Sequence, residues 1–315
     1  MRILLVTPAP PKSRAGNRTT AARWAAILTA LGHRVAITTE FSGQNADLMI
    51  ALHAWRSADS IRQFSQVFPQ RPLVVAITGT DAYRFIQTHP DTTQQSIRLA
   101  SHLVGLHDLI GNTLPQDQRN KLHVIYQSAK PVPRRQPYRR FFHVSVMGHL
   151  REEKDPLRPA LAARLLPPDS RIQVHQYGKA HSDDWAVEAR AEMQANPRYT
   201  WHDEIPHYRI RQIYQRTHLL VLPSRMEGGA NVISEAVVAG VPVIASDIEG
   251  SIGLLGEDYP GYYPVENEQA LADLMHGAET DSTFYKKLER ACSARQSLFT
   301  PENETRGWQH LLSKL

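Results

Sequence analysis

The stretch that decides the fold is residues 223–246, Pro-Ser-Arg-Met-Glu-Gly-Gly-Ala-Asn-Val-Ile-Ser-Glu-Ala-Val-Val-Ala-Gly-Val-Pro-Val-Ile-Ala-Ser. An apolar run at residues 219–222 comes before it and predicts a buried strand. The glycines at 228 and 229 permit a turn in which a ligand can approach the main chain. Residues 230–239 predict a short helix, which the next glycine ends and the following proline keeps from continuing. The stretch is therefore predicted to form a strand, a glycine-rich loop, a helix and a second strand.

A glycine-rich turn that leads into a helix is a candidate anion site. The first N–H groups of such a helix are unpaired, and the positive end of the helix dipole lies behind them. Glu227 precedes the turn and Glu235 lies within the helix. Carboxylates repel phosphates, so we expect this pair to accept hydrogen bonds from the hydroxyls of a sugar and a ribose. The alternative is that both are solvated glutamates beside a helix N-terminus.

Length and composition predict a globular protein of two domains. The chain has 315 residues, 42% of them apolar and 21% charged. No apolar run reaches the ~20 residues that cross a bilayer, so no membrane span is expected. The strand pattern at residues 2–6 is too short for the apolar core of a signal peptide. The lone Cys292 cannot form an internal disulfide, and a cytoplasmic location is expected.

The positive charge is concentrated in the first half of the chain. Up to Arg135 there are 16 Lys and Arg against 7 Asp and Glu, and the remainder has 20 against 24. This asymmetry could draw a small anion into a cleft between the two halves, and unpatterned surface charge is the alternative. The basic residues are scattered and no aromatic and basic repeat accompanies them, so nucleic acid is not expected as a partner.

Three predicted strands of the first half end in polar or charged residues. The strand at residues 2–6 precedes a long loop after which Thr19 or Thr20 is expected to cap a helix. The strand at residues 48–52 precedes His53, and the strand at residues 73–77 precedes Thr78-Gly79-Thr80-Asp81. Because ligands bind at the carboxyl ends of parallel strands, these loops are candidate site segments.

The prolines of residues 128–138 predict a linker. It divides a first domain, residues 1–132, from a second, residues 133–300, and residues 301–315 predict a final helix. In the second domain a strand at residues 142–147 leads into Gly148, with Arg151 and Lys154 before a helix. Strands and helices alternate in both halves. The predicted fold class is α/β, with two doubly wound Rossmann-like domains facing an interdomain cleft.

Two of these stretches resemble motifs of the family-four GT-B glycosyltransferases. Glu227 and Glu235, followed by Gly-x-Pro-Val-Ile-Ala-Ser, match the Glu-x7-Glu block, and residues 148–154 are similar to Gly-x-Leu-x-x-x-Lys-Gly. Asp155-Pro156 replaces the last glycine of that second motif, which leaves the cations in place and the shape of the loop open. In such enzymes the last helix commonly returns to the first domain.

The resemblance implies a nucleotide-sugar donor site in the second domain. Glu227 would hold the donor sugar and Glu235 the ribose, while Arg151, Lys154 and the backbone of residues 228–231 would hold the diphosphate. The donor-binding residues expected are Gly16, Gly148, Arg151, Lys154, Glu227, Gly228, Gly229, Ala230, Asn231 and Glu235.

Further stretches resemble one branch of these enzymes, the selenosugar synthases of selenoneine biosynthesis. They include residues 16–24, 52–58, 78–81, 148–156, 225–231 and 258–262. The resemblance implies transfer of a sugar, typically N-acetylglucosamine, from its UDP donor to selenophosphate. A carbon–selenium bond forms and, after loss of phosphate, a selenosugar results. His53, Arg151, Lys154 and Glu227 are the implied catalytic residues.

The first half carries residue types that suit a charged acceptor. Selenophosphate is an anion with a polarisable selenium, so it needs less help from a general base than a sugar hydroxyl. It does need cations that offset repulsion from the UDP diphosphate. We expect it to be bound by Arg14, Asn17, Arg18, His53, Arg56, Thr78 and Thr80. No Asp or His cluster has metal-ligand spacing, so neither a metal nor a bound cofactor is expected beside the UDP-sugar.

Three alternatives stay open. The first is a conventional GT-B glycosyltransferase that acts on a hydroxyl of a glycan, a lipid or a small molecule. The second is a nucleotide-sugar epimerase, which would release UDP without an acceptor. The third is a non-catalytic protein that binds nucleotide sugars and turns nothing over.

Overall fold

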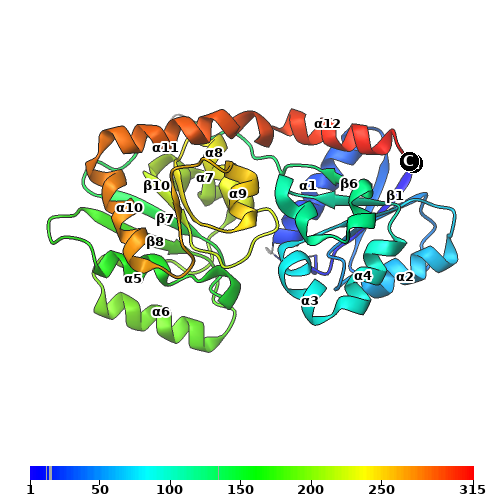
Figure 1. Cartoon of the computed structure of the whole chain (residues 1–315), viewed down its shortest axis with the longest axis horizontal. Coiled ribbons are helices and arrows are strands. Elements are labelled where there is room, and N and C mark those ends of the chain that lie inside the picture. Colours follow the sequence, from blue (N-terminus) through cyan, green and yellow to red (C-terminus); the bar gives the residue numbers. More distant parts are fainter. Residues whose placement is uncertain (12, 14–15, 134) are drawn as a thin grey trace. The chain divides into compact units, whose positions relative to one another are not determined.

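The structure, a computed structural model, describes residues 1–11, 13, 16–133 and 135–315. It contains two compact units. The first comprises Met1–Gln127, Glu227–Asn231 and Pro301–Leu315, and the second comprises Ser128–Met226 and Val232–Thr300. Each unit is built on a six-stranded parallel sheet with helices on its faces (Figure 1).

The first sheet has the strand order β2-β1-β3-β4-β5-β6, and every neighbouring pair is parallel. The strands are β1 Arg2–Val6, β2 Arg34–Thr38, β3 Leu48–Leu52, β4 Leu73–Ala76, β5 His102–Gly105 and β6 Leu122–Val124. The chain continues from β1 to one side and then returns to β3 on the other. The order therefore reverses between β1 and β3, and ligands of open α/β sheets bind at the carboxyl ends of such a pair.

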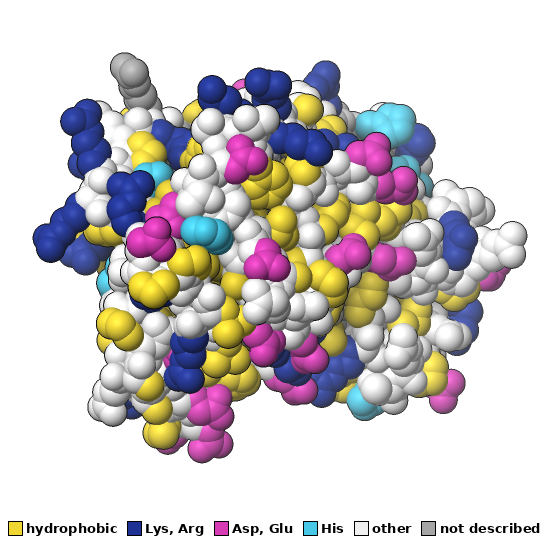
Figure 2. Space-filling view, turned by 60° about the vertical axis from the view of Figure 1, so that its left-hand side comes forward, with side chains coloured by type: hydrophobic (Ala, Val, Ile, Leu, Met, Phe, Trp, Pro, Cys, Tyr) yellow, Lys and Arg dark blue, Asp and Glu magenta, His cyan; other side chains and the backbone are white. Residues whose placement is uncertain are grey.

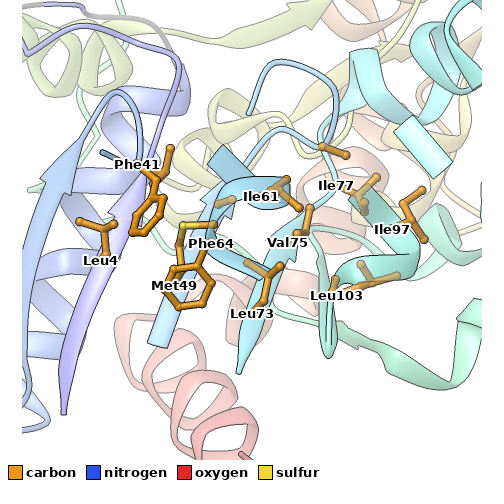
Figure 3. Packing of buried hydrophobic residues seen from close by; sticks show 14 of the residues in the cluster. Leu4, Phe41, Met49, Ile61, Phe64, Leu73, Val75, Ile77, Ile97 and Leu103 are labelled. Carbon is orange, nitrogen blue, oxygen red and sulfur yellow. The ribbon is translucent and has the colours of Figure 1, made fainter. Parts of the chain in front are cut away.

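Side chains of alternate direction along these strands fill two separate cores. Leu4 and Met49 pack on one face with Phe64 of α2 (Ala58–Val67) and Ile97 of α4 (Pro90–Leu99), as Figure 3 shows. The neighbouring strand residues point to the opposite face, toward α1 (Gly16–Ala30) and α12 (Pro301–Leu312). Burial on both faces accounts for the nearly unbroken apolar runs of the central strands. Polar side chains are left to the strand ends.

The second sheet has the order β12-β11-β10-β7-β8-β9, again all parallel. Its strands are β7 Phe142–Met147, β8 Ile172–Tyr177, β9 Tyr199–Trp201, β10 Leu219–Leu222, β11 Val243–Ser246 and β12 Tyr262–Tyr263. Its order reverses between β7 and β10. The loops that follow these two strands are those that the sequence singles out as anion sites.

The remaining helices connect these strands. They are α5 Arg158–Arg164, α6 Asp183–Ala195, α7 His207–Arg216, α8 Asn231–Val238, α9 Glu249–Leu255, α10 Glu268–Thr280 and α11 Ser282–Arg295. Short turns of helix are η1 Asp81–Phe85, α3 Ile86–Thr88, η2 Asp108–Thr113, η3 Gln116–Lys121, η4 Glu152–Lys154 and η5 Gln296–Phe299. In the described part of the chain, none is both long and apolar enough to cross a membrane.

The expected cap of the first helix was wrong. Helix α1 begins at Gly16, ahead of Thr19 and Thr20, and Thr20 is buried within it. The hydroxyl of Thr20 lies 3.4 Å from Oε1 of Gln127. A long-range contact has replaced the local capping bond that the sequence favoured.

Helix α12 is fastened to α1 by a buried carboxylate. The side chain of Glu304 is fully buried and lies 3.0 Å from Nε of Arg23, and it accepts a hydrogen bond of 2.8 Å from the indole of Trp24. The Trp24 and Trp308 rings pack edge to face with centroids 4.8 Å apart. A buried charge is tolerated only when it is paired and hydrogen-bonded in this way.

Replacing Glu304 with Ala should therefore destabilise the first unit strongly. The change leaves the half-buried Arg23 guanidinium without its partner, and breaking buried pairs from one side costs about 3–5 kcal/mol. Urea unfolding followed by tryptophan fluorescence would measure it. The exposed Glu302 of the same helix is the matched control, and a Glu304→Ala loss as small as that of Glu302→Ala would contradict the assignment.

Candidate functional site

Two loops lie at the switch point of the second sheet, one after β7 and one after β10. Arg225 joins them. Its N–H donates to the carbonyl of Glu153 at 2.9 Å, and its guanidinium lies 2.7 Å from Glu266 and 3.6 Å from Glu152. Within the second unit, the backbone that leaves β10 is thereby held at residue 225 beside the loop that carries the predicted cations. Arg225 occurs in one of the stretches that resemble the selenosugar synthases, but the sequence alone indicated no role for it. Its contacts between the two loops were therefore not predicted.

The loop after β7 has a left-handed residue at the position where the motif has a glycine. Asp155 has φ 42° and ψ 52°, the left-handed conformation that glycine adopts most easily. Its carboxylate accepts a hydrogen bond of 2.8 Å from Nε of Arg158, and Asp is among the few other residues that visit this region. Asp155 therefore takes the backbone role of the missing glycine and adds an ion pair at the start of α5.

The two predicted cations follow Gly148 at this edge of the sheet. Nε of Arg151 is buried without a hydrogen-bond partner in the described part of the chain, and its nearest carboxylate, that of Glu153, is 3.8 Å away. A Cβ built on Gly148 would lie 3.8 Å from Cδ of Lys154. The side chain of Arg151 is 38% exposed, so its donors are accessible to an anionic ligand.

A buried tyrosine orients one of the two glutamates. The hydroxyl of Tyr214 is 3.2 Å from Oε2 of Glu235 and 3.3 Å from the carbonyl of Val232. Burial and then the charge of Glu235 raise the pKa of Tyr214 well above its usual range, so the phenol stays protonated and donates. Tyr214 thus fixes one carboxylate oxygen. Nothing in its local sequence indicated this role.

The glycines after Glu227 are needed because two backbone segments meet there. Within the first unit, a Cβ on Gly228 would lie 2.6 Å from the carbonyl carbon of Thr78, and one on Gly79 would lie 2.8 Å from that of Glu227. Gly229 has φ 144°, a conformation that side chains disfavour. Glu227 is 8% exposed. The predicted anion loop therefore adjoins the Thr78 loop of the same unit.

Arg23 supports the start of α8 in this unit. Its Nη1 donates to Oδ1 of Asn231 at 3.1 Å, while Nη2 donates to Gln127 at 2.8 Å. The ion pair with Glu304 holds the same guanidinium from the other side. Ala230, the remaining residue of the predicted diphosphate loop, is 4% exposed. Arg23 is a further site-supporting residue that the sequence did not single out.

The strand ends of the first unit bring several predicted acceptor residues together. His53 follows β3, is 2% exposed and has φ 77°. Its ring lies 2.6 Å from the carboxylate of Asp81 and 3.1 Å from the hydroxyl of Thr80. Burial alone would raise the pKa of Asp81, but hydrogen bonds and charge from His53, with N–H groups of Trp55 and Thr78, outweigh it and lower that pKa. Asp81 belongs to the candidate segment Thr78-Gly79-Thr80-Asp81, but it was not predicted to be a site residue.

The other acceptor candidates lie on α1 and on the loop after β3. Asn17 and Arg18 are half-buried on α1, and Gly16, the first residue of that helix, is exposed. Arg18 makes no hydrogen bond or ion pair with the described residues. Arg56 is exposed. Arg14 lies outside the described residues, and the acceptor assignments stay predictions.

Neither a metal-ligand cluster nor a basic stripe marks the described part of the chain and the face shown in Figure 2, respectively. No group of three or more His, Cys, Asp or Glu there could hold a metal ion, and Cys292 is buried. On the face shown in Figure 2, acidic and basic side chains are interspersed with apolar ones between them. A basic stripe is the usual footprint of nucleic-acid binding, and this face carries mixed charge instead.

The model of the family described as glycosyl transferases group 1 matches residues 136–295, just over half of the chain. The chain belongs to this family. The matched segment contains both loops at the switch point of the second sheet. It shows the family, whereas the selenosugar branch has no support beyond the resemblance in sequence.

Known proteins resemble the chain in part of its sequence and in its whole fold. The putative teichuronic acid biosynthesis glycosyltransferase TuaC of Bacillus subtilis (strain 168) is 34% identical over 72 residues, which are 23% of this chain and 18% of that relative. Sucrose-phosphate synthase from Thermosynechococcus elongatus superposes with a TM-score of 0.82 at 16% identity, covering 99% of this chain and 98% of its own. Anabaena HepE in complex with UDP and glucose gives 0.76 at 17% identity over 100% of both chains. The predicted class of two Rossmann-like parallel-sheet units, the GT-B fold, is confirmed.

The left-handed residue of the β7 loop gives a test of this geometry. Asp155→Gly removes the ion pair with Arg158 but relieves the backbone, whereas Asp155→Ala removes the ion pair and keeps the unfavourable conformation. We expect Ala to be less stable than Gly by about 1–2 kcal/mol, measured by urea unfolding. Equal stabilities of the two variants would show that residue 155 is not left-handed.

Proposed function

We propose that this protein transfers a sugar from a UDP-sugar donor. The observation that carries the proposal lies in the second unit, where the loop with Arg151 and Lys154 is hydrogen-bonded to Arg225 of the segment after β10, at the switch point of the second sheet. Membership of the glycosyl transferases group 1 family supports transferase activity, and HepE, a protein of the same fold, was solved with UDP-glucose. The reaction would need no resident metal, and the cytoplasm is its proposed location.

Each donor residue has a distinct proposed role. Arg151, Lys154 and the N–H groups of residues 228–231 would hold the diphosphate and stabilise the charge that develops on UDP as it leaves. Glu227 would bind the hydroxyls of the sugar. Glu235, whose Oε2 accepts a hydrogen bond from Tyr214, would bind the ribose. Gly16 and Gly148 would allow close approach of the donor to the backbone.

For the acceptor we propose selenophosphate. Its selenium would attack the anomeric carbon as the bond to the UDP oxygen breaks. Water would then cleave the selenium–phosphorus bond, which releases phosphate and leaves the selenosugar with a protonated or anionic selenium. The sequence resemblance supports this choice, as does the half-buried Arg18, which makes no hydrogen bond or ion pair with the residues that the structure describes. The proposed acceptor residues are Arg14, Asn17, Arg18, His53, Arg56, Thr78 and Thr80.

A conventional transfer to a hydroxyl is the second candidate. The short match to TuaC, whose name places it in teichuronic acid biosynthesis, favours it. The two candidates share the donor site and differ only in the acceptor.

The first test is UDP release from UDP-N-acetylglucosamine with and without freshly prepared selenophosphate. We expect release to depend on selenophosphate, because the anion supplies the nucleophile, and mass spectrometry should show a sugar with the selenium isotope pattern. UDP binding without any selenosugar, over several donor sugars, would rule out the selenophosphate acceptor and leave the hydroxyl candidate.

A substitution series separates the donor residues from the acceptor residues. Arg151→Ala and Lys154→Ala should each weaken UDP binding about 10- to 100-fold, because hydrogen bonds to charged groups contribute about 1.5–3 kcal/mol. Arg18→Ala should leave UDP affinity unchanged and lower the rate with the acceptor. Calorimetry and steady-state rates would measure both, with the exposed Lys286→Ala as control. Equal loss of UDP affinity in both classes would defeat the division.

A further inference from the structure

His53 and Asp81 form a buried pair at the carboxyl ends of β3 and β4, and its protons can be assigned one by one. Oδ1 of Asp81 lies 2.6 Å from Nδ1 of His53 and accepts the N–H of Trp55 at 3.0 Å. Oδ2 accepts the N–H of Ala54 at 2.9 Å and both the N–H and the hydroxyl of Thr78, at 3.0 and 2.9 Å. Since each of these neighbours is a donor, the carboxyl group is ionised.

The carboxylate decides the tautomer of the histidine. Nδ1 of His53 must carry a proton, because two lone pairs 2.6 Å apart would repel. The N–H of Arg56 also lies 3.3 Å from Nδ1, but a protonated nitrogen has no lone pair to accept it, and the shorter contact with Asp81 prevails. The proton that can come and go is therefore on Nε2, which lies 3.1 Å from the hydroxyl of Thr80.

That proton decides what Thr80 can offer to a ligand. When Nε2 is unprotonated, it takes the Thr80 hydroxyl proton, and the Thr80 oxygen presents only lone pairs. When Nε2 is protonated, it donates to the Thr80 oxygen, and the hydroxyl proton can turn to a ligand instead of to the Thr78 oxygen, which lies 3.5 Å away. An anionic group accepts hydrogen bonds and donates none, so it requires the second state. Thr80 is half-buried whereas His53 is buried, so Thr80 is the residue that a ligand can reach.

The charges around the ring favour the protonated state when an anion is bound. Asp81 pairs with the His53 ring at 2.6 Å, and Glu227 is a second carboxylate on the segment that meets Gly79 in the same unit. Phe85 packs against the ring with centroids 5.6 Å apart, and Arg84 and His89 lie against Phe85. On the same loop as His53, Arg56 contributes its main chain while its side chain is exposed. When an anion binds and His53 takes up a proton, the Asp81 carboxylate can thus stabilise the resulting imidazolium.

We propose that Thr80, His53 and Asp81 form an acceptor subsite that binds an anionic group together with one proton, which Nε2 of His53 takes up. The subsite rests on the proposed function and narrows it to acceptors with an anionic oxygen or selenium, such as selenophosphate. A neutral hydroxyl would instead donate to Thr80 and bind without proton uptake. Thr80 contacts the ligand, and His53 and Asp81 are positioning residues.

Sulfate is the first probe, because its charge does not change between pH 6.5 and 9, so any proton taken up belongs to the protein. Calorimetry in buffers of different ionisation enthalpy would count the protons, with thiophosphate as a second probe. We expect the wild type to take up protons on binding and its affinity to fall by up to tenfold per pH unit as pH rises. Repeating the titration in Arg151→Ala separates sulfate bound at the donor loop.

Variants of the three residues should respond differently. His53→Asn keeps a residue that tolerates a positive φ and should bind sulfate with no proton uptake and no pH dependence. Asp81→Asn should reduce the uptake, and the exposed Asp91→Asn of α4 should behave as wild type. If Asp81→Asn does not fold, Thr80→Ser and Thr80→Val carry the test, since the serine hydroxyl should keep the uptake and valine should abolish it.

Three outcomes would each overturn the subsite. The first is that the wild type binds no anion, and the second is that its binding is independent of pH. Proton uptake that persists in His53→Asn or Thr80→Val is the third. UDP binding measured on the same samples tests the donor assignment separately, because sulfate needs no donor. A wild type that takes up protons with sulfate but does not bind UDP would refute the proposed transferase and leave the anion subsite standing.

Discussion

Burial of both faces of two parallel sheets is the constraint on which the rest of this structure depends. Strands such as β3 and β10 are apolar at every position and wholly buried, so no side chain along them is available for polar chemistry. Parallel strands also direct all their carboxyl ends to one edge. Polar and charged residues therefore collect in the loops at that edge, and the reversal of strand order leaves room for a ligand between two of those loops.

The elements fixed by local patterns could be predicted from the sequence. Strands at residues 48–52 and 142–147 were predicted with the bounds that the structure shows, because each is an apolar run that ends at a polar residue or glycine. The glycine-rich loop and the cations after β7 were found from spacing. The start of α1 was not, because Thr20 is drawn into a contact with Gln127 more than a hundred residues away.

The supporting residues of the site escaped prediction for the same physical reason. Arg23, Tyr214 and Arg225 act through partners that are distant in sequence or lie on another loop, and a single sequence does not show which partner each will meet. Asp155 shows the opposite case, in which a departure from the motif does not prevent the expected kind of turn. Its sequence departs from the motif, yet its backbone adopts a left-handed conformation of the kind that glycine adopts most easily. Motif matching scores the side chain, whereas the fold selects the dihedral angles.

The two anion sites proposed for this chain differ in how their hydrogen bonds are supplied. Backbone N–H groups and guanidinium groups donate at every accessible pH, because neither loses its proton there. A diphosphate that always carries negative charge is suited to such fixed donors. The Thr80 hydroxyl, in contrast, can donate or accept, and the direction follows the proton on His53. An anionic acceptor is repelled by the diphosphate. If one proton is taken up when the acceptor binds, the net negative charge added to the site is smaller by one, and the repulsion is weaker. Fixed donors for one ligand and an adjustable donor for the other would let two anions occupy the same enzyme.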